Sequence, residues 1–179
     1  MRIKQYHGDI WDLHAAGWYV ADPTNLYVKA NGANVMGRGI SRQVLERWPG
    51  IDLWYGRQLM EQVRPEVAAA GMVSFADVAS QPVVINDQHR IAFVPVKTHW
   101  RLKADRKLMR ASLSHLAALL IAHSEMKIAL PRLGCGNGGD KWEGDEGVKE
   151  QLFRPFLNDL PERARERVAI VHPPAGISD

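Results

Sequence analysis

Two glycine-rich stretches contain the residues of this sequence whose types and spacing favour chemistry on an anion. The first covers residues 31–39 (NGANVMGRG), and the second places four glycines within residues 134–139. Consecutive backbone N–H groups in such loops form concavities that bind anions, and a helix N-terminus adds to the attraction. Glycines that only make turns are the alternative. Neither stretch has the Gly-Lys-Ser/Thr of a P-loop, so the pair predicts a diphosphate held in a different way.

One lysine stands out as a candidate for the chemistry itself. Lys97 follows the apolar segment 90–95, which is typical of a buried strand. Partial desolvation at such a position lowers the pKa of the amine and makes it available as a base or a nucleophile. A solvated lysine at a strand end is the alternative. His99 is a weaker candidate, as a structural or substrate-edge residue. Cys135 has no sequence-local base and is predicted to pack rather than react.

The elements that must position these groups alternate along the chain. The pattern predicts an irregular connection over residues 11–24, and helical spacing begins at Met36 and repeats through Trp48. The segments 82–85 and 90–95 are predicted to pair as a hairpin. Strands are expected at residues 2–6, 26–30, 73–78, 82–85, 90–95, 127–130 and 168–171, and helices at 36–48, 52–64, 105–123 and 146–153. This alternation predicts a three-layer α/β/α domain with a central mixed sheet, whose ligands bind beyond the carboxyl ends of the strands.

Length and composition limit the number of domains and the kinds of site that this chain can form. A chain of 179 residues with 46% hydrophobic and 24% charged residues is typical of one globular domain spanning residues 1–179. The single cysteine excludes an internal disulfide, and no His, Asp or Glu cluster has metal-ligand spacing. No apolar run is long enough to span a membrane. The sequence therefore predicts a cytoplasmic monomer with no metal, no cofactor and no membrane association.

Basic residues are concentrated after Lys97. Six occur from Lys97 to Arg110 against one acid, Asp105. A solvated helix face is one explanation. Attraction of a nucleic-acid backbone is the other, because the cluster begins at the candidate lysine. On that interpretation Arg38, His99 and Arg101 contact nucleic acid.

Four motifs in order resemble the macrodomain family. They are GDIW (8–11), NGANVMGRGI (31–40), VPVKTHWR (94–101) and LGCGNGGDKW (133–142). The sequence is most similar to the branch that contains the DNA ADP-ribosyl glycohydrolase antitoxins and the terminal ADP-ribose protein glycohydrolases. The resemblance covers nearly the whole chain and implies a macrodomain fold that binds ADP-ribose.

The resemblance also implies a role for each matched position. Asp9 would accept the adenine amino group beside the backbone of Ile10, Asn31 would hold the distal ribose, and Lys97 would be catalytic. His172 lies where the family often stacks an aromatic ring on adenine. The other implied ligand contacts are Val35, Met36, Gly37, Arg38, Gly39, Ile40, Leu133, Gly134, Cys135, Gly136, Asn137, Gly138 and Gly139.

The implied activity is removal of ADP-ribose from a modified target, with ADP-ribosylated thymidine in DNA favoured. The protein-deconjugating relatives carry an acidic residue where this sequence has Gly138, and Asp140 lies two places further on. Hydrolysis of carboxylate-linked ADP-ribose on protein, and dephosphorylation of ADP-ribose 1″-phosphate, are the enzymatic alternatives. A non-catalytic ADP-ribose reader is the alternative of another class. A cognate ADP-ribosyltransferase toxin is the implied partner.

Overall fold

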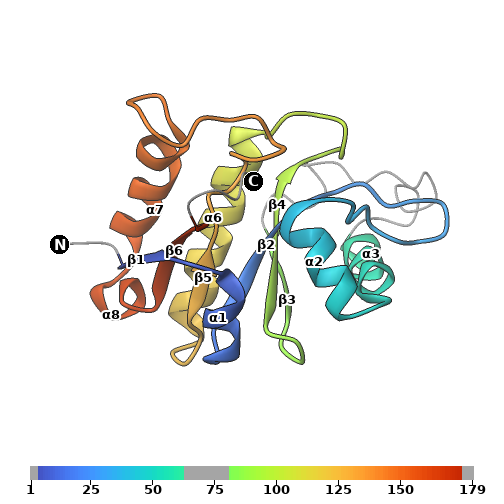
Figure 1. Cartoon of the computed structure of the whole chain (residues 1–179), viewed down its shortest axis with the longest axis horizontal. Helices are drawn as coiled ribbons and strands as arrows, with labels where there is room; N and C mark the ends of the chain where they lie inside the picture. Colours follow the sequence, from blue (N-terminus) through green and yellow to red (C-terminus); the bar gives the residue numbers. More distant parts are fainter. Residues whose placement is uncertain (1–3, 63–80, 175–179) are drawn as a thin grey trace.

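A single mixed sheet lies at the centre of the fold. The computed structural model describes residues 4–62 and 81–174, and within them six strands form one sheet in the order β1-β6-β5-β2-β4-β3 (Figure 1). Only the β3–β4 pair is antiparallel, which makes the sheet mixed as predicted. The strands are β1 (Lys4–His7), β2 (Tyr19–Asn25), β3 (Val84–Asn86), β4 (Ile91–Lys97), β5 (Ile128–Leu130) and β6 (Val168–His172).

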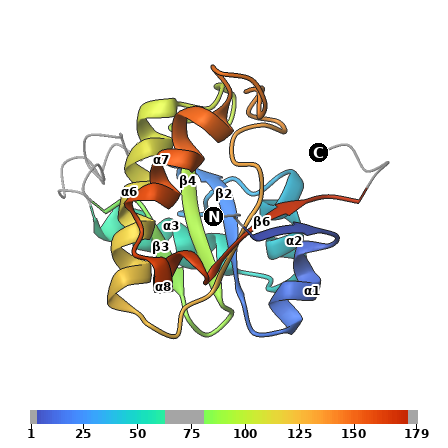
Figure 2. The same cartoon turned by 90° about the vertical axis from the view of Figure 1, so that its left-hand side faces the viewer.

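Helices cover both faces of this sheet (Figure 2). Residues alternate along β4, so that Val94 and Val96 pack in one buried cluster and Ile91 and Phe93 in the other. The first cluster includes α6 (Arg106–Ala122), the π-helical turn η1 (Lys149–Phe153), α7 (Arg154–Asp159) and α8 (Glu162–Arg165). The second includes α1 (Ile10–Ala15), α2 (Gly39–Arg47) and α3 (Ile51–Glu61). The predicted three-layer α/β/α architecture is confirmed.

The prediction was wrong for residues 11–30. The segment 11–24 is not irregular, because it contains most of α1 and β2, and the strand predicted at 26–30 lies earlier, in β2. The side chain of Asp9 starts α1 by accepting the N–H of Trp11 at 3.0 Å. Pro23 is tolerated inside β2 because β5 pairs only with Tyr19 and Val20, so the edge that Pro23 faces carries no ladder hydrogen bond.

The remaining elements agree with the sequence apart from their ends. The predicted hairpin exists as β3 and β4, and the long predicted helix is α6. The helix predicted at 146–153 is the turn η1 followed by α7, with Pro155 in its first turn, and α8 was not predicted. The strand predicted at 73–78 lies outside the described residues. Within the described ranges, no helix has the length and apolarity that crossing a bilayer requires.

Candidate functional site

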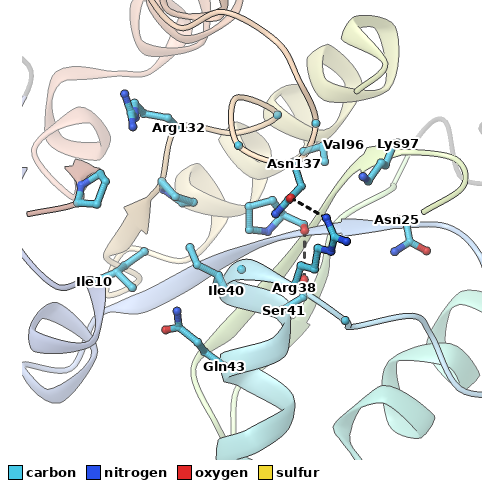
Figure 3. Close-up of a pocket in the computed structure, with 18 of the residues that line it drawn as sticks. Ile10, Asn25, Arg38, Ile40, Ser41, Gln43, Val96, Lys97, Arg132 and Asn137 are labelled. Carbon is cyan, nitrogen blue, oxygen red and sulfur yellow. Dashed lines mark hydrogen bonds between the residues drawn. The ribbon is translucent and has the colours of Figure 1, made fainter. Parts of the chain in front are cut away.

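A cavity of about 900 Å³ opens at the carboxyl edge of the sheet (Figure 3). Asp9 follows β1, Asn25 ends β2, Lys97 ends β4, and Pro173 follows β6, and all four line it. Both glycine-rich stretches line it as well, through residues 35 and 37–39 and through residues 134, 136 and 138. The parallel arrangement explains this convergence, because carboxyl ends of parallel strands meet at one edge.

The first glycine-rich stretch leads directly into α2. No side chain caps the first turn of α2, and its first residues, Gly39, Ile40 and Ser41, line the cavity. The first backbone N–H groups of a helix have no partner within the helix. They are therefore available to an anion in the cavity, together with the positive end of the helix dipole.

The second glycine-rich stretch is held in shape by its own backbone and by an ion pair. The N–H of Asp140 donates to the carbonyl oxygen of Gly134 at 3.0 Å, and that of Gly139 to Gly136 at 2.9 Å. Arg106 holds both carboxylate oxygens of Asp140, at 2.7 and 2.9 Å, and this contact lowers the pKa of Asp140. Asp140 is thus engaged in anchoring the loop.

Gly138 occupies a position where a side chain does not fit. A Cβ atom built on Gly138 would lie 2.4 Å from the carbonyl oxygen of Gly134. That oxygen also accepts the N–H of Asp140, so it cannot move without breaking the turn. The backbone of this loop therefore excludes an acidic residue at position 138.

Arg38 joins the two glycine-rich stretches across the cavity. Its guanidinium donates to Oδ1 of Asn137 at 3.4 Å, as Figure 3 shows. The contact is long and exposed, so it contributes little stability. Its position brings a permanent positive charge to the space between the two loops. A diphosphate bound there would meet this charge and the backbone N–H groups of both loops.

Lys97 is half-buried in the wall of the same cavity. Burial lowers the pKa of its amine, and the positive charge of Arg38 lowers it further. Both effects disfavour the ammonium form, which increases the fraction of free amine at neutral pH. This agrees with the property expected of Lys97 from the sequence.

Asn25 stands beside Lys97 at the carboxyl ends of the strands. Asn25 is the residue paired with Lys97 in the register of β2 and β4. Its Nδ2 donates to the carbonyl oxygen of Val35 at 2.9 Å, and its Oδ1 accepts the N–H of Tyr27 at 3.0 Å. Nδ2 of Asn34 also lies 3.5 Å from this Oδ1. These contacts fix the orientation of the amide and leave the second N–H of Nδ2 for a ligand.

Asn31 lies outside the residues that line the cavity. Residues 28–34 form a turn closed by the Val28–Asn34 bridge and by the N–H of Lys29 donating to Ala33 at 2.8 Å. Asn31 is at the tip of this turn, and its Oδ1 accepts the N–H of Ala33 at 3.2 Å. The prediction for Asn31 assumed a strand at 26–30, whereas β2 ends at Asn25. The signal for Asn25 was present in the ADPTN segment, but Pro23 obscured the strand.

Gln43 is a second polar side chain that the sequence prediction missed. Its Oε1 accepts the indole N–H of Trp11, so its amide N–H₂ group is directed toward the cavity between Ile10 and Ile40 (Figure 3). Gln43 lies one helical turn after Gly39, on the face of α2 that Ile40 shares. That spacing from the first glycine-rich stretch was the available signal.

Other predicted ligand contacts do not line the cavity. Met36 and Leu133 are buried in the two hydrophobic clusters. The Sγ of Cys135 donates to the carbonyl oxygen of Leu133, and Gly139 and His99 also lie outside the lining. Of the predicted positions, those that do line it are Asp9, Ile10, Val35, Gly37, Arg38, Gly39, Ile40, Lys97, Arg101, Gly134, Gly136, Asn137 and Gly138.

His172 is turned away from the cavity. Its ring stacks on His7 with centroids 4.8 Å apart, and its Nε2 lies 2.5 Å from Oε1 of Gln5. Side chains alternate along β6, so Val171 faces the cavity and His172 faces the opposite side. Val171 and Pro173 supply the apolar surface where an aromatic ring was expected.

A buried acid lies under the cavity floor. Asp22 is fully buried in β2, and its Oδ1 is 2.5 Å from Oγ of Ser41. Burial raises the pKa of Asp22 to about 7, although the Ser41 contact opposes the shift. The Oγ of Ser41 also lies 3.2 Å from the carbonyl oxygen of Pro23. The hydroxyl of Ser41 donates to Oδ1 of Asp22, whereas Oδ2 of Asp22 is buried without a hydrogen-bond partner among the described residues. Residues 4–62 and 81–174 hold no group of three or more His, Cys, Asp or Glu side chains that could bind a metal.

The chain matches known proteins over most of its length. It is 31% identical over 156 residues to the DNA ADP-ribosyl glycohydrolases of Mycobacterium tuberculosis and Mycobacterium bovis, which covers 87% of this chain. The chain spans 40% of the length of those relatives. No protein-family model matches it.

Solved structures of related proteins also resemble this chain. The macrodomain of Mycobacterium tuberculosis DarG is 26% identical, with a TM-score of 0.61 over 96% of this chain and 98% of that one. Thermosipho africanus DarTG in complex with ADP-ribose is 17% identical, with a TM-score of 0.57, and covers 100% of this chain and 44% of its own. The second likeness shows the fold alone. The chain has the macrodomain fold, and its sequence resembles the DarG branch of that family.

Proposed function

We propose that this chain is an ADP-ribosyl glycohydrolase that removes ADP-ribose from modified DNA, with ADP-ribosylated thymidine as its substrate. One observation carries the proposal. A lysine with a lowered pKa lines the same cavity as two anion-binding backbone loops and the acid that follows β1. The relatives named DNA ADP-ribosyl glycohydrolase and the neighbour solved with ADP-ribose support the substrate.

ADP-ribose fits the order of groups along the cavity. Asp9 uses one carboxylate oxygen to cap α1, which leaves the other for the adenine amino group. Ile10, Ile40 and Val171 offer apolar contact to the base. The diphosphate would lie between the two glycine-rich loops near Arg38. The distal ribose would then reach Asn25 and Lys97 at the far end.

The amine of Lys97 would act at the anomeric carbon, C1″. Hydrolysis breaks the bond between C1″ and the thymine nitrogen, adds the hydroxyl of water to C1″ and returns a proton to the base. Lys97 could assist opening of the ribose ring by proton transfer, or attack the opened sugar to form a Schiff base. Asn25 would hold the ribose during either step. Reductive trapping with cyanoborohydride separates the two routes, because only a Schiff base leaves ADP-ribose attached to Lys97.

The second loop favours DNA over protein as the carrier of ADP-ribose. An acidic residue at position 138 accompanies the lysine in the protein-deconjugating relatives, and the contact between a Cβ there and Gly134 excludes such a side chain here. The neighbouring acid, Asp140, is held by Arg106. Lys97 would therefore work without a carboxylate partner from this loop.

We further infer that the natural partner is an ADP-ribosyltransferase toxin that supplies the modified DNA, and that the macrodomain acts as a cytoplasmic monomer. The resemblance of the sequence to the antitoxin branch of the macrodomains, with the neighbour named DarTG, supports the first inference. Light scattering of the chain mixed with ADP-ribosylated DNA measures its mass and tests whether it acts as a monomer.

The deciding experiment compares two substrates that carry the same ADP-ribose. One is a single-stranded oligonucleotide with ADP-ribosylated thymidine, and the other is a protein modified on a glutamate carboxylate. Release of free ADP-ribose from the DNA, lost in Lys97→Ala with ADP-ribose binding retained, is the expected result. Release from the protein alone would overturn the DNA assignment. Binding of ADP-ribose with no release from either, or phosphate release from ADP-ribose 1″-phosphate, would support a reader or a phosphatase.

A further inference from the structure

An aromatic and basic surface borders the cavity beyond Lys97. We call Tyr27, His99, Trp100 and Arg101 the rim cluster. Trp100 is 41% exposed although it is a large hydrophobic residue, and it lines the mouth of the cavity together with Arg101. A tryptophan in this position presents a large apolar ring and an N–H donor to a ligand at the cavity mouth.

The rim cluster is held in a stacked arrangement. The rings of His99 and Trp100 lie 5.6 Å apart at an interplanar angle of 24°, and the guanidinium carbon of Arg101 lies 4.6 Å from the centre of the Trp100 ring. The ring centroids of Tyr27 and His99 lie 4.6 Å apart at an interplanar angle of 64°. The N–H of Arg101 donates to Nδ1 of His99 at 3.1 Å, which fixes the local turn. The surface therefore needs little ordering when a ligand binds.

Positive charge around the rim cluster is not neutralised. Within the described residues, Arg38, Arg101 and Lys103 take part in no ion pair. The two nearby acids are engaged elsewhere, because Asp105 caps α6 and Asp140 holds Arg106. An anionic chain leaving the cavity at Lys97 would be attracted along this side.

We propose that the rim cluster binds a nucleobase that flanks the modified nucleotide in single-stranded DNA. Aromatic rings and arginine planes stack on unpaired bases, and cations beside them hold the phosphates. A base inside a duplex has no free face for such stacking, so the surface selects single strands. The inference rests on the proposed function, because it places the ADP-ribosylated base at Lys97 and its neighbour at Trp100.

The test compares an ADP-ribosylated thymidine mononucleotide with a ten-residue oligonucleotide that carries the same modification. Stacking of one base gives about a 5- to 100-fold gain in affinity. We therefore expect Trp100→Ala to reduce the preference for the oligonucleotide by at least about fivefold, through KM rather than kcat. Trp100→Phe should restore most of it. Leu102→Ala is the matched control, because Leu102 is exposed on the same turn and also lines the cavity but has no aromatic face.

Two outcomes would overturn the inference. One is an unchanged preference in Trp100→Ala, and the other is an equal loss in Leu102→Ala, which would indicate a general effect of the loop. Fluorescence anisotropy with an unmodified single strand and the corresponding duplex separates this inference from the proposed function. Loss of single-strand binding in Trp100→Ala supports the rim cluster even if the chain releases no ADP-ribose. Release of ADP-ribose with no binding of unmodified single strands by the intact chain contradicts the rim cluster alone.

Discussion

Asn25 and Lys97 are register partners at the carboxyl ends of β2 and β4, and both side chains line the cavity that the two glycine-rich loops enclose. The register shifts between Thr24 and Asn25, where the regular pairing of the two strands ends. The amide of Asn25 and the amine of Lys97 lie at this irregularity, at one end of the cavity. β-Bulges of this kind are common next to active sites, where they redirect a side chain.

The amine of Lys97 should control how activity depends on pH. Burial and the charge of Arg38 lower its pKa, so activity should rise with pH through that lowered value and then level off. Arg38→Gln removes one of the two causes. We expect it to raise the Lys97 pKa and move the rising limb of kcat to higher pH, whereas Lys103→Gln should leave the profile in place. An unshifted profile in Arg38→Gln would contradict this electrostatic coupling.

The two asparagines provide a matched pair of variants. Asn25→Ala removes an amide that lines the cavity, and Asn31→Ala removes one at the tip of the 28–34 turn. We expect the first to reduce kcat/KM by about 10- to 100-fold and the second to have less than a twofold effect, because an amide hydrogen bond to a reacting sugar contributes about 1–3 kcal/mol. Steady-state kinetics of both variants on modified DNA shows which asparagine the reaction requires. A large loss in Asn31→Ala alone would restore the assignment made from the sequence.

Gln43 should determine part of the affinity for the nucleoside end of ADP-ribose. Trp11 holds its Oε1, which leaves the amide N–H₂ group to donate into the cavity. Gln43→Ala should weaken ADP-ribose binding by about 5- to 10-fold, which corresponds to one neutral hydrogen bond. Isothermal titration calorimetry measures this, and Gln58→Ala on the surface of α3 is the control. Equal affinities for the wild type and Gln43→Ala would remove Gln43 from the binding site.

A methyl group at position 138 should distort the second loop. The Cβ of Gly138→Ala would lie 2.4 Å from the carbonyl oxygen of Gly134, so we expect a loss of about 1–3 kcal/mol in the free energy of unfolding and weaker ADP-ribose binding. A Cβ on Gly37 has no neighbour within 4 Å, so Gly37→Ala should keep the wild-type free energy of unfolding. Denaturant titration compares the two variants. Equal stability of both would show that the loop adapts to a side chain.

Asp22 should make stability depend on pH in a defined direction. Its pKa is about 7 in the folded state, against 3.8 for a solvent-exposed aspartate, so the folded protein binds the proton more tightly. Its contribution is therefore fully present below pH 3.8 and declines by about 1.4 kcal/mol per pH unit up to pH 7. Asp22→Asn keeps an oxygen that accepts from Ser41 and cannot ionise. The difference in unfolding free energy between wild type and Asp22→Asn should follow this slope. A constant difference from pH 4 to pH 7 would contradict it.

The sequence determined the local features of this protein. Glycine spacing marked both loops, hydrophobic periodicity marked α2 and α6, and the apolar segment before Lys97 identified β4 and the lysine at its end. These features depend on neighbours along the chain, so they can be recognised from the sequence alone. The four macrodomain motifs were local in the same sense, and the family they indicated agrees with the comparisons.

The tertiary structure decided which residues meet in the cavity. Whether β2 ends at Asn25 or later depends on its pairing with β4, and that pairing brings Asn25 rather than Asn31 to Lys97. The direction of His172 depends on the alternation along β6, and the role of Gln43 depends on Trp11, 32 residues away in the chain. Such positions are set by contacts between distant segments. A sequence pattern records the type of each residue but not the register that brings distant residues together.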